Sequence, residues 1–508
     1  MQINLSEIQT LCDRNPRVTD FAFFVFGALL TLSFAPFNLY LLAPVFAAVV
    51  LLGSLCLAPR TAARCAFWFA FGHFLGGTYW IYISVHVIGG APLMVAFVLM
   101  LGLVSIMALF FAGTGWLMSR LVAGDALRLV VAAPAIWVVI EWLRGWFLSG
   151  FPWLSLGYSQ IDSPLAGWAP LLGIYGVSWM LLISATGIVL AVIRRHQAIA
   201  LALFVLPWLL GYGLREVEWT QPVGDPVLTT IVQGGVAQED KWLEKQFKPT
   251  VKLYQDALDA IQESTLVVWP EVAIPALLGL GDEYLGMLQT DMQARGKSLV
   301  MGLLEYDREN HRVYNSVLLL DGERQQVYRK RHLVPFGEYF PVPDFVREWM
   351  RLMDLPNSDI TAGVARQPVL VAADGTKMGV AICYEDAYGA EQLYAIADAN
   401  IMINVSNDGW FGESIAAFQH LQIARMRALE VERWVVRATN NGMSAFIGPK
   451  GELVATAPRF AYATLDQAIQ PRTGLTPYAS MGNVAILLPL CLAIAWSARR
   501  QMGYRGKN

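Results

Sequence analysis

The chain has 508 residues and a formal net charge of −3, and 56% of its residues are hydrophobic while only 15% are charged. Soluble domains average about 25% charged residues, so this composition excludes a soluble globular enzyme and a disordered chain. The near balance of 37 basic and 40 acidic residues provides no polybasic surface, so we expect no nucleic-acid partner.

Uncharged or nearly uncharged stretches, longer than the roughly 20 residues that cross a bilayer as one helix, recur along the chain. These stretches, with the number of helices that each can hold, are 21–59 (two), 65–119 (two), 129–193 (two), 197–214 (one) and 473–498 (one). Gly and Pro residues interrupt the longer ones, as turns do. The sequence therefore predicts a polytopic α-helical membrane domain with eight spans.

Basic residues alternate between the two sides of this predicted domain. Twelve Lys and Arg residues lie in the N-terminal segment, in alternate connections and in the C-terminal tail, and the three intervening short loops carry none. Because cytoplasmic loops are enriched in Lys and Arg, we expect both termini in the cytoplasm and the segment after Leu214 on the opposite face. In a bacterium this is a multi-pass protein of the inner membrane with a periplasmic domain. The first apolar run is too long for a cleaved signal peptide.

Residues 215–480 have an ordinary globular composition and a length that suits one large α/β domain. We therefore divide the chain into a membrane domain (1–214), a periplasmic domain (215–480), and an eighth span with a cytoplasmic tail (481–508). Strand-like runs in the middle part are 228–233, 265–269, 298–304, 313–320, 369–371, 378–382, 401–405 and 443–447. A helix pattern from Pro249 to Ser264, and hairpin turns at 321–322 and 374–375, favour a layered α/β sandwich over a purely parallel sheet.

Cys383 is the one cysteine in the predicted periplasmic domain. A solitary cysteine in an oxidising compartment is either a reactive thiol or a small buried apolar side chain. Cys383 follows the apolar run 378–382 and precedes a helix predicted to begin near Asp386. Such an elbow exposes the thiol and aims a helix N-terminus at it, so the context favours a nucleophile.

Two other segments also end in an ionisable side chain that could take part in catalysis. The run 266–269 ends at Glu271, which Pro270 holds in a turn, and the segment 328–338 places Lys330 at the end of a hairpin. In the order Glu271, Lys330, Cys383, these segments resemble the nitrilase, or carbon–nitrogen hydrolase, superfamily. That resemblance implies a Glu-Lys-Cys catalytic triad on a four-layer αββα sandwich.

Within that superfamily, the chain is similar to the apolipoprotein N-acyltransferase family over its whole length. The strings that carry this similarity are 147–154, 270–271, 330–339, 383–385 and 404–412. The resemblance implies transfer of an acyl chain from a phospholipid to the N-terminal α-amino group of an S-diacylglyceryl-cysteine apolipoprotein, through a thioester acyl-enzyme. This step completes lipoprotein maturation, and we expect a monomer to perform it.

The resemblance and the local chemistry together assign roles. A free thiol, with a pKa of about 8.5, is mostly protonated at neutral pH, so Cys383 needs Glu271 to take its proton. The Lys330 ammonium would stabilise the oxyanion by about 3 kcal/mol, as one oxyanion-hole donor does. Glu338 is expected to orient Lys330 or to assist proton movement, and the alternative is a surface carboxylate.

The supporting candidates come from the same strings. Tyr384 and Glu385 either line the site or begin the helix after the cysteine. Trp242, on the basis of the resemblance, and Trp410 and Phe411 are candidates for an apolar access route for acyl chains. The alternative is that these aromatic residues belong to the core.

Glu141 and Arg144 lie three residues apart in a predicted span, so they share a helix face. Charges in spans usually pair or face a polar cavity, which leaves a structural ion pair and a lipid-headgroup site as alternatives. His311, His332 and His420, with a single cysteine, make no recognisable zinc spacing. We expect no metal and no other cofactor.

Two other functions remain open from the sequence. A membrane-anchored nitrilase-type amidase would hydrolyse small carbon–nitrogen substrates, and it differs from an acyltransferase in letting water attack the acyl-enzyme. A transporter with a periplasmic binding domain would carry polar groups in several spans near mid-membrane. The sequence offers few such groups, namely Glu141, Arg144, His73 and His86.

Overall fold

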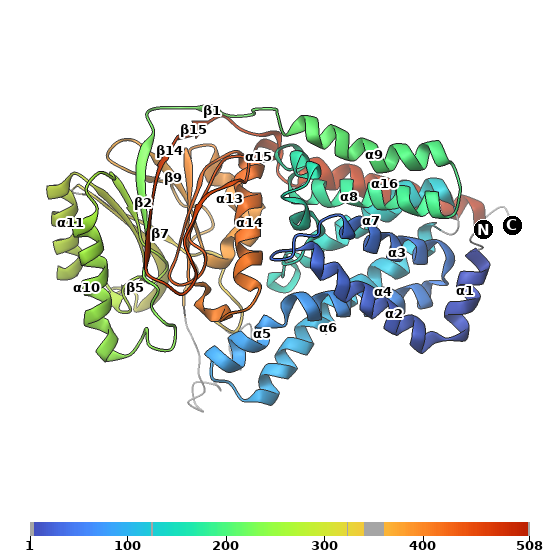
Figure 1. Cartoon of the computed structure of the whole chain (residues 1–508), viewed down its shortest axis with the longest axis horizontal. Helices are drawn as coiled ribbons and strands as arrows, with labels where there is room; N and C mark the ends of the chain where they lie inside the picture. Colours follow the sequence, from blue (N-terminus) through green and yellow to red (C-terminus); the bar gives the residue numbers. More distant parts are fainter. Residues whose placement is uncertain (1–4, 123–124, 323, 340–359, 506–508) are drawn as a thin grey trace. The chain divides into compact units, whose positions relative to one another are not determined.

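The computed structural model describes residues 5–122, 125–322, 324–339 and 360–505, and the chain divides into two compact units (Figure 1). The helical unit contains Met1–Glu218, Phe411–Gln422 and Thr476–Asn508. The sandwich unit contains Trp219–Trp410 and Ile423–Leu475. The segment Phe411–Gln422 is therefore grouped with the apolar helices, which the division at residues 214 and 480 did not anticipate.

The helical unit is built from the apolar stretches of the sequence. Its helices are α1 (Leu5–Arg14), α2 (Pro16–Leu30), α3 (Leu42–Cys56), α4 (Pro59–Thr78), α5 (Trp80–Tyr82), α6 (Leu93–Val122), α7 (Ala126–Arg144), α8 (Ala169–Val192), α9 (Gln197–Leu214), α15 (Pro477–Met481) and α16 (Val484–Arg505). Six segments of the described residues are long and apolar enough to cross a membrane, namely Pro16–Ser33, Leu93–Val122, Ala126–Arg144, Pro164–Val192, Gln197–Leu214 and Val484–Met502. Several helices able to span a membrane are thus present, as predicted, while the number eight stays a prediction.

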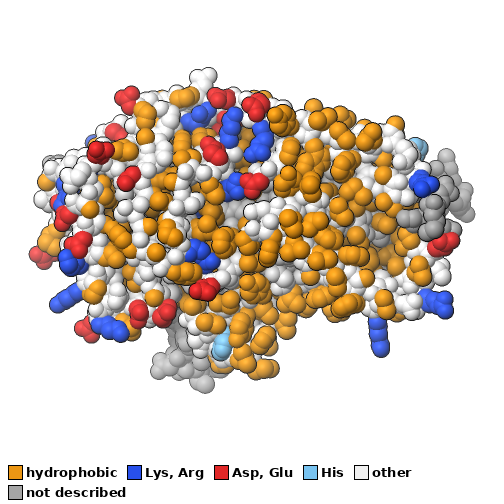
Figure 2. Space-filling model, viewed as in Figure 1, with side chains coloured by type: hydrophobic (Ala, Val, Ile, Leu, Met, Phe, Trp, Pro, Cys, Tyr) orange, Lys and Arg blue, Asp and Glu red, His pale blue; other side chains and the backbone are white. Residues whose placement is uncertain are grey.

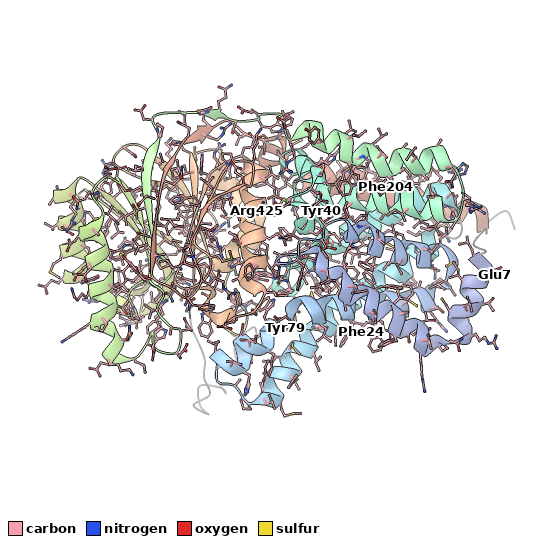
Figure 3. The ribbon with its side chains drawn as sticks, in the orientation of Figure 1. Glu7, Phe24, Tyr40, Tyr79, Phe204 and Arg425 are labelled. Carbon is pink, nitrogen blue, oxygen red and sulfur yellow. The ribbon has the colours of Figure 1, made fainter. Side chains whose placement is uncertain are left out.

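Close helix packing and an apolar outer surface both suit a lipid environment. A Cβ atom on Gly27 of α2 would clash with the backbone oxygen of Phe69, and one on Gly72 of α4 would clash with that of Phe24. Phe24 is labelled among the side chains of α2 in Figure 3. Small residues allow such backbone approach between membrane helices. Hydrophobic side chains cover most of the visible face of this unit (Figure 2).

The segment Phe411–Gln422 packs on aromatic residues of the helical unit. The Oε1 atom of buried Gln419 accepts hydrogen bonds from the indole nitrogens of Trp80, at 3.3 Å, and of Trp153, at 2.7 Å. The ring of Phe411 lies 4.8 Å from that of Trp80. One buried amide thus satisfies two buried indoles, which explains why this segment groups with the helices.

The sandwich unit contains two main sheets. One has the order β13-β12-β11-β10-β9-β8, and the other has the order β14-β2-β3-β5-β6-β7, with β4 beside β5. The strands of these sheets are β2 (Val227–Gln233), β3 (Leu266–Val268), β4 (Leu277–Leu278), β5 (Ser298–Asp307), β6 (Arg312–Asp321), β7 (Arg324–Arg329), β8 (Leu370–Val371), β9 (Lys377–Ile382), β10 (Ile401–Ser406), β11 (Val435–Thr439), β12 (Ala445–Ile447), β13 (Leu453–Thr456) and β14 (Ala463–Ile469). A short separate pair joins β1 (Gln221–Pro222) to β15 (Arg472–Thr473).

Alternation of side chains along the strands produces the layers. Ile231 and Val268 face the second sheet and form one core with its strands, whereas Val232 and Val267 face the opposite way. The outward-facing set packs under α10 (Glu244–Ala260) and α11 (Glu283–Arg295). Figure 1 shows α13 (Gly389–Ile396) and α14 (Ala416–Val431) beside the other sheet. This arrangement confirms the predicted layered α/β sandwich.

Most predicted strands match observed ones, and both hairpins are present as antiparallel pairs, β6 with β7 and β8 with β9. Strands β11, β13 and β14 were not predicted, and neither were the two-residue strands β1, β4 and β15. The helix predicted to begin at Pro249 begins five residues earlier, at Glu244, so the proline lies inside α10. An acidic side chain in the first turn favours that earlier start, because it interacts with the positive end of the helix dipole.

Candidate active site

Lys330 lies directly after β7 with its side chain buried between two carboxylates. Its Nζ atom is 2.9 Å from a carboxylate oxygen of Glu338 and 3.8 Å from Oε1 of Glu271. Burial opposes the charge, but Glu338 and then Glu271 raise the pKa of Lys330 well above its ordinary value. Lys330 is therefore a fixed cation, and Glu338 is not the surface carboxylate that the sequence left open.

Asn315, on β6, bridges the same two carboxylates. Its Nδ2 atom donates to Oε1 of Glu271 at 2.7 Å and to Oε1 of Glu338 at 2.9 Å. Its backbone oxygen accepts from the backbone nitrogen of Lys330 at 2.8 Å. The sequence reasoning missed this residue, although a lone amide within the apolar run 313–320 was a signal.

Glu271 follows β3 through Trp269 and Pro270, and it is buried. The turn lies against Gly302 of β5, whose backbone nitrogen donates to the oxygen of Pro270 at 3.2 Å. A Cβ atom on Gly302 would lie 2.6 Å from the Cα atom of Glu271, which is closer than real contacts allow. The absence of a side chain on Gly302 therefore lets the Glu271 turn approach β5 closely.

Cys383 follows β9, and its backbone φ of 50° is in the left-handed region, which is uncommon for residues other than glycine. The strand ends at Ile382, and a single helical turn covers Cys383–Ala387. Burial, and next the charge of Glu271, raise the pKa of the Cys383 thiol, while Lys330 acts in the opposite direction. The resting thiol is therefore protonated at neutral pH and requires a base.

A buried polar chain leads from Cys383 into the second sheet. The hydroxyl of Ser406 forms a hydrogen bond with the cysteine that lowers its pKa, and it donates to Oδ1 of Asp408 at 3.0 Å. Asp408 pairs with Arg437 at 3.0 Å, and Arg437 also pairs with Asp386 at 3.3 Å. The string 404–412 that carries the sequence similarity includes Ser406 and Asp408 without singling out either, and Arg437 lies outside every such string.

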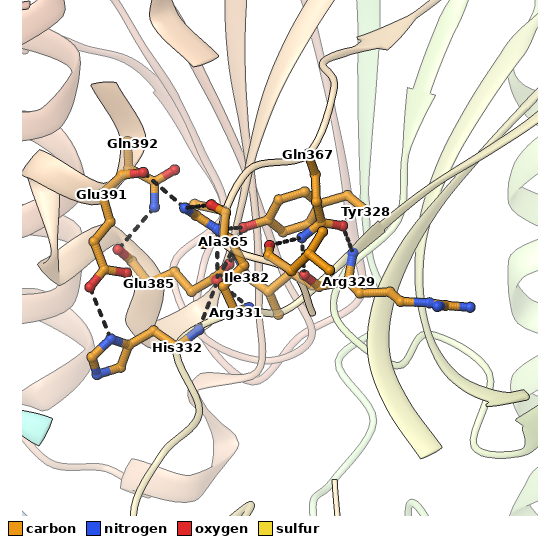
Figure 4. Close-up of polar contacts among 12 residues, drawn as sticks. Tyr328, Arg329, Arg331, His332, Ala365, Gln367, Ile382, Glu385, Glu391 and Gln392 are labelled. Atoms are coloured by element: carbon orange, nitrogen blue, oxygen red, sulfur yellow. Dashed lines mark hydrogen bonds and ion pairs between the residues drawn. The ribbon is translucent and has the colours of Figure 1, made fainter. Parts of the chain in front are cut away.

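Glu385 connects the turn at Cys383 to the segment that follows Lys330, called here the lysine loop (Figure 4). Its carboxylate accepts hydrogen bonds from the backbone nitrogen of Ile382 at 2.8 Å, from that of Arg331 at 2.7 Å and from the hydroxyl of Tyr328 at 3.0 Å. Ile382 precedes the cysteine, and Arg331 follows Lys330. Burial raises the pKa of Glu385. Glu385 thus fixes the relative position of two candidate catalytic segments.

Tyr384 lies in an aromatic cluster beside the elbow. Its ring is 5.1 Å from that of Tyr388 and 6.1 Å from the imidazole of His332. His332 stacks on Tyr388 at 3.6 Å, and its Nδ1 atom is 3.2 Å from Oε1 of Glu391. These contacts give His332 a structural place near the lysine loop.

The three aromatic candidates lie in different surroundings. Trp242 precedes α10 and is 52% exposed, and Trp410 is 44% exposed, both within the sandwich unit. Phe411 belongs to the helical unit, where its ring also lies 6.3 Å from that of Trp153. Exposure suits Trp242 and Trp410 for contact with an apolar ligand, whereas Phe411 packs on other aromatic rings.

Glu141 and Arg144, at the end of α7, are buried in the helical unit and bind the chain that follows. Arg144 donates to the backbone oxygens of Phe151 and, at 2.9 Å, Trp153. Oε1 of Glu141 accepts from the backbone nitrogen of Leu156 at 2.6 Å. Both residues therefore hold the loop between α7 and α8.

Within the described ranges, no group of three or more His, Cys, Asp or Glu residues has the geometry to hold a metal ion. The residues brought together are two carboxylates, a buried lysine, a bridging amide and a thiol. Such a set suits nucleophilic catalysis, in which one carboxylate accepts the thiol proton and the ammonium faces developing negative charge.

Comparisons with known proteins match both units. Residues 26–187 match the family model described as the apolipoprotein N-acyltransferase N-terminal domain, and residues 228–478 match the one described as carbon-nitrogen hydrolase. The apolipoprotein N-acyltransferase of Methylococcus capsulatus is 39% identical and that of Azotobacter vinelandii is 40% identical. The alignments cover 90% of this chain and 91% of the first relative, and 94% of this chain and 94% of the second.

Among solved structures, Saccharomyces cerevisiae Nit3, a member of branch 10 of the nitrilase superfamily, aligns with a TM-score of 0.39 at 18% sequence identity. That alignment covers 50% of this chain and 93% of Nit3.

Proposed function

This chain belongs to the apolipoprotein N-acyltransferase family, and from that premise we propose that it transfers an acyl chain from a phospholipid to the N-terminal α-amino group of an S-diacylglyceryl-cysteine apolipoprotein. The observation that carries the proposal is the presence, in one chain, of an apolar helical unit and of a buried carboxylate–lysine–carboxylate cluster acting on a cysteine.

The first half-reaction loads the enzyme. Glu271 takes the proton of Cys383, and the thiolate attacks the ester carbonyl carbon of the phospholipid. Lys330 stabilises the oxyanion of the tetrahedral intermediate. The C–O bond then breaks, Glu271 returns the proton to the leaving alkoxide, and a lysophospholipid departs. Cys383 is left as a thioester.

The second half-reaction transfers the acyl group. The α-amino group of the apolipoprotein attacks the thioester carbonyl, and Glu271 accepts a proton from that amine. The C–S bond breaks, the thiolate of Cys383 takes the proton back, and an amide is formed. Glu338 and Asn315 hold Lys330 and Glu271 in position through both steps. Glu338 contacts the lysine, and Asn315 donates hydrogen bonds to Glu271 and Glu338.

The membrane setting matches the substrates. Each CH₂ group of an acyl chain costs about 0.8 kcal/mol to expose to water, so both the donor and the lipidated acceptor are best kept in a bilayer or an apolar groove. We assign Trp242 and Trp410, which are exposed, to contact with these chains. Phe411 and the pair Glu141–Arg144 are assigned to supporting the helical unit.

The test is the fate of the acyl group when different acceptors are offered. With phospholipid and a synthetic diacylglyceryl-cysteine peptide, the purified protein should release an N-acylated peptide and a lysophospholipid in equal amounts. Without the peptide, free fatty acid should form much more slowly than amide does in its presence. If water competes equally with the peptide, or if small amides are hydrolysed efficiently, the protein is an amidase instead.

We further propose eight spans, both termini in the cytoplasm, a periplasmic sandwich unit and a monomeric enzyme. The twelve basic residues that alternate with uncharged loops support this orientation. Reporter enzymes fused after Arg60, Arg120 and Arg195 should report cytoplasm, and one fused within 215–480 should report periplasm. A cytoplasmic signal from the sandwich unit would contradict the orientation.

A further inference from the structure

Lys241 is a buried lysine for which the mechanism above has no use. Its side chain is only 2% exposed, and its Nζ atom donates to the backbone oxygen of Glu271 at 3.3 Å. Within the described residues, that oxygen is the one hydrogen-bond acceptor of the Nζ atom. An ammonium group has three donors, and burying it with a single partner is unfavourable, so the position of Lys241 requires a reason.

The charges of the active centre explain why a lysine is buried at position 241. Glu271 and Glu338 carry two negative charges, and Lys330 supplies one positive charge. The Lys241 ammonium, which interacts with the charge of Glu271, makes the set neutral. Burial lowers the pKa of Lys241 to about 8 and Glu271 acts in the opposite direction, so most of the charge is present at neutral pH.

The loop that carries Lys241 is anchored at two further points. Oε1 of Gln238 accepts a hydrogen bond from Nδ2 of Asn407 at 2.7 Å. The backbone oxygen of Val236 accepts from Nδ2 of Asn440 at 2.8 Å. The next residue along the chain is the exposed Trp242. One short loop thus connects an exposed indole to the main chain of Glu271.

We propose that Lys241 is a positioning residue that holds the turn of Glu271 and supplies the second positive charge of the active centre. It contacts the main chain of Glu271, so it acts through that residue and not on the substrate. The proposal rests on the role of Glu271 as the base in the proposed function. Its test must therefore succeed or fail independently of acyl transfer.

The test compares Lys241→Met with Lys297→Met. Lys297 is also a buried lysine of the sandwich unit, and its Nζ atom donates to the backbone oxygens of Gln262 and Ser264 at 2.9 and 2.6 Å. It precedes β5, at the end of the strands opposite to Glu271. The readout is the rate at which iodoacetamide alkylates Cys383, followed by peptide mass over a series of pH values, with Cys383→Ala as the blank.

Lys241→Met leaves the active centre with an excess negative charge, which disfavours the thiolate. Glu271, Lys330 and Asp408, which act on Cys383, are unchanged in the variant. The alkylation rate at neutral pH should fall roughly tenfold, as a rise of about one unit in the pKa of the thiol would cause. Lys241→Arg, which keeps the charge, should return the rate to the wild-type value. Lys297→Met should not change it.

The proposal is overturned if folded Lys241→Met follows the wild-type alkylation profile, or if Lys241→Arg lowers the alkylation rate as far as Lys241→Met does. Circular dichroism checks folding, and Lys241→Gln replaces the methionine variant if that variant does not fold. Alkylation needs no lipid. A wild type that alkylates normally but transfers no acyl chain would therefore refute the proposed function alone, while the difference in rate between variants still decides the role of Lys241.

Discussion

Replacing Lys330 by arginine should lower the rate of acyl transfer by roughly 10²- to 10³-fold, the cost of losing one oxyanion-hole donor, although the positive charge is retained. The side chain is 1% exposed, and its Nζ atom lies between Glu338 at 2.9 Å and Glu271 at 3.8 Å. A guanidinium group is planar and broader than an ammonium group, so it cannot occupy that position and face the same oxyanion.

The matched control is Lys297→Arg, which makes the same change at a buried lysine bonded to backbone oxygens. It should retain transfer in whatever fraction of the protein is folded. Near-normal turnover by a well-folded Lys330→Arg enzyme would show that Lys330 serves only the structure.

Replacing Glu271 by glutamine should slow the acylation of Cys383 by at least about 10²-fold, the lower end of general-base contributions. Glutamine keeps the shape and the contact with Asn315 but cannot accept the thiol proton. The sign of the pH dependence follows from the cysteine. Burial still raises the pKa of Cys383 in this variant, while the contribution of the Glu271 charge to that rise is lost. The residual acylation should therefore rise steadily as the pH increases and more thiolate forms.

Glu305→Gln is the control for this substitution. Glu305 is another buried carboxylate, on β5, and it pairs with Arg329. Its loss should reduce the free energy of unfolding, though by less than the roughly 3–5 kcal/mol of a fully buried pair because the Arg329 side chain is 32% exposed, and the acylation rate of folded protein should not change. Equal acylation rates in Glu271→Gln and wild type would remove Glu271 from the mechanism.

The candidate catalytic residues were predictable because each follows a strong local pattern. Cys383 comes directly after an apolar strand, Glu271 follows another through Trp269 and Pro270, and Lys330 comes after a hairpin. The membrane helices were predictable for a similar reason, since uncharged stretches of sufficient length have few other uses. In both cases the signal lies within a few neighbouring residues of the chain.

Residues that act across the fold were not predictable in the same way. Asn315 matters because β6 pairs with β7 and places its amide between Glu271 and Glu338. Glu385 was expected to line the site or to begin a helix, yet its carboxylate binds backbone nitrogens of two separate segments. Such roles depend on strand register and on contacts distant in sequence, which spacing along the chain does not report.

The buried charges show the same limit. Lys241 stands next to the exposed Trp242, and nothing in the order of these two residues indicates which side chain faces inward. The segment Phe411–Gln422 lies within the predicted periplasmic domain, yet it packs with the helical unit through Gln419. Only the fold reveals the partners of such side chains.

The central claim is the covalent acyl-enzyme, and the most direct measurement is the intact mass of the purified protein after incubation with phospholipid and no acceptor. We expect the mass to rise by one acyl group on Cys383, with release of a lysophospholipid, and hydroxylamine should remove the adduct. Glu271→Gln should acquire the adduct slowly and Cys383→Ala not at all. A wild-type enzyme that forms no thioester without the amine, or a Cys383→Ala enzyme that still transfers acyl chains, would contradict the mechanism.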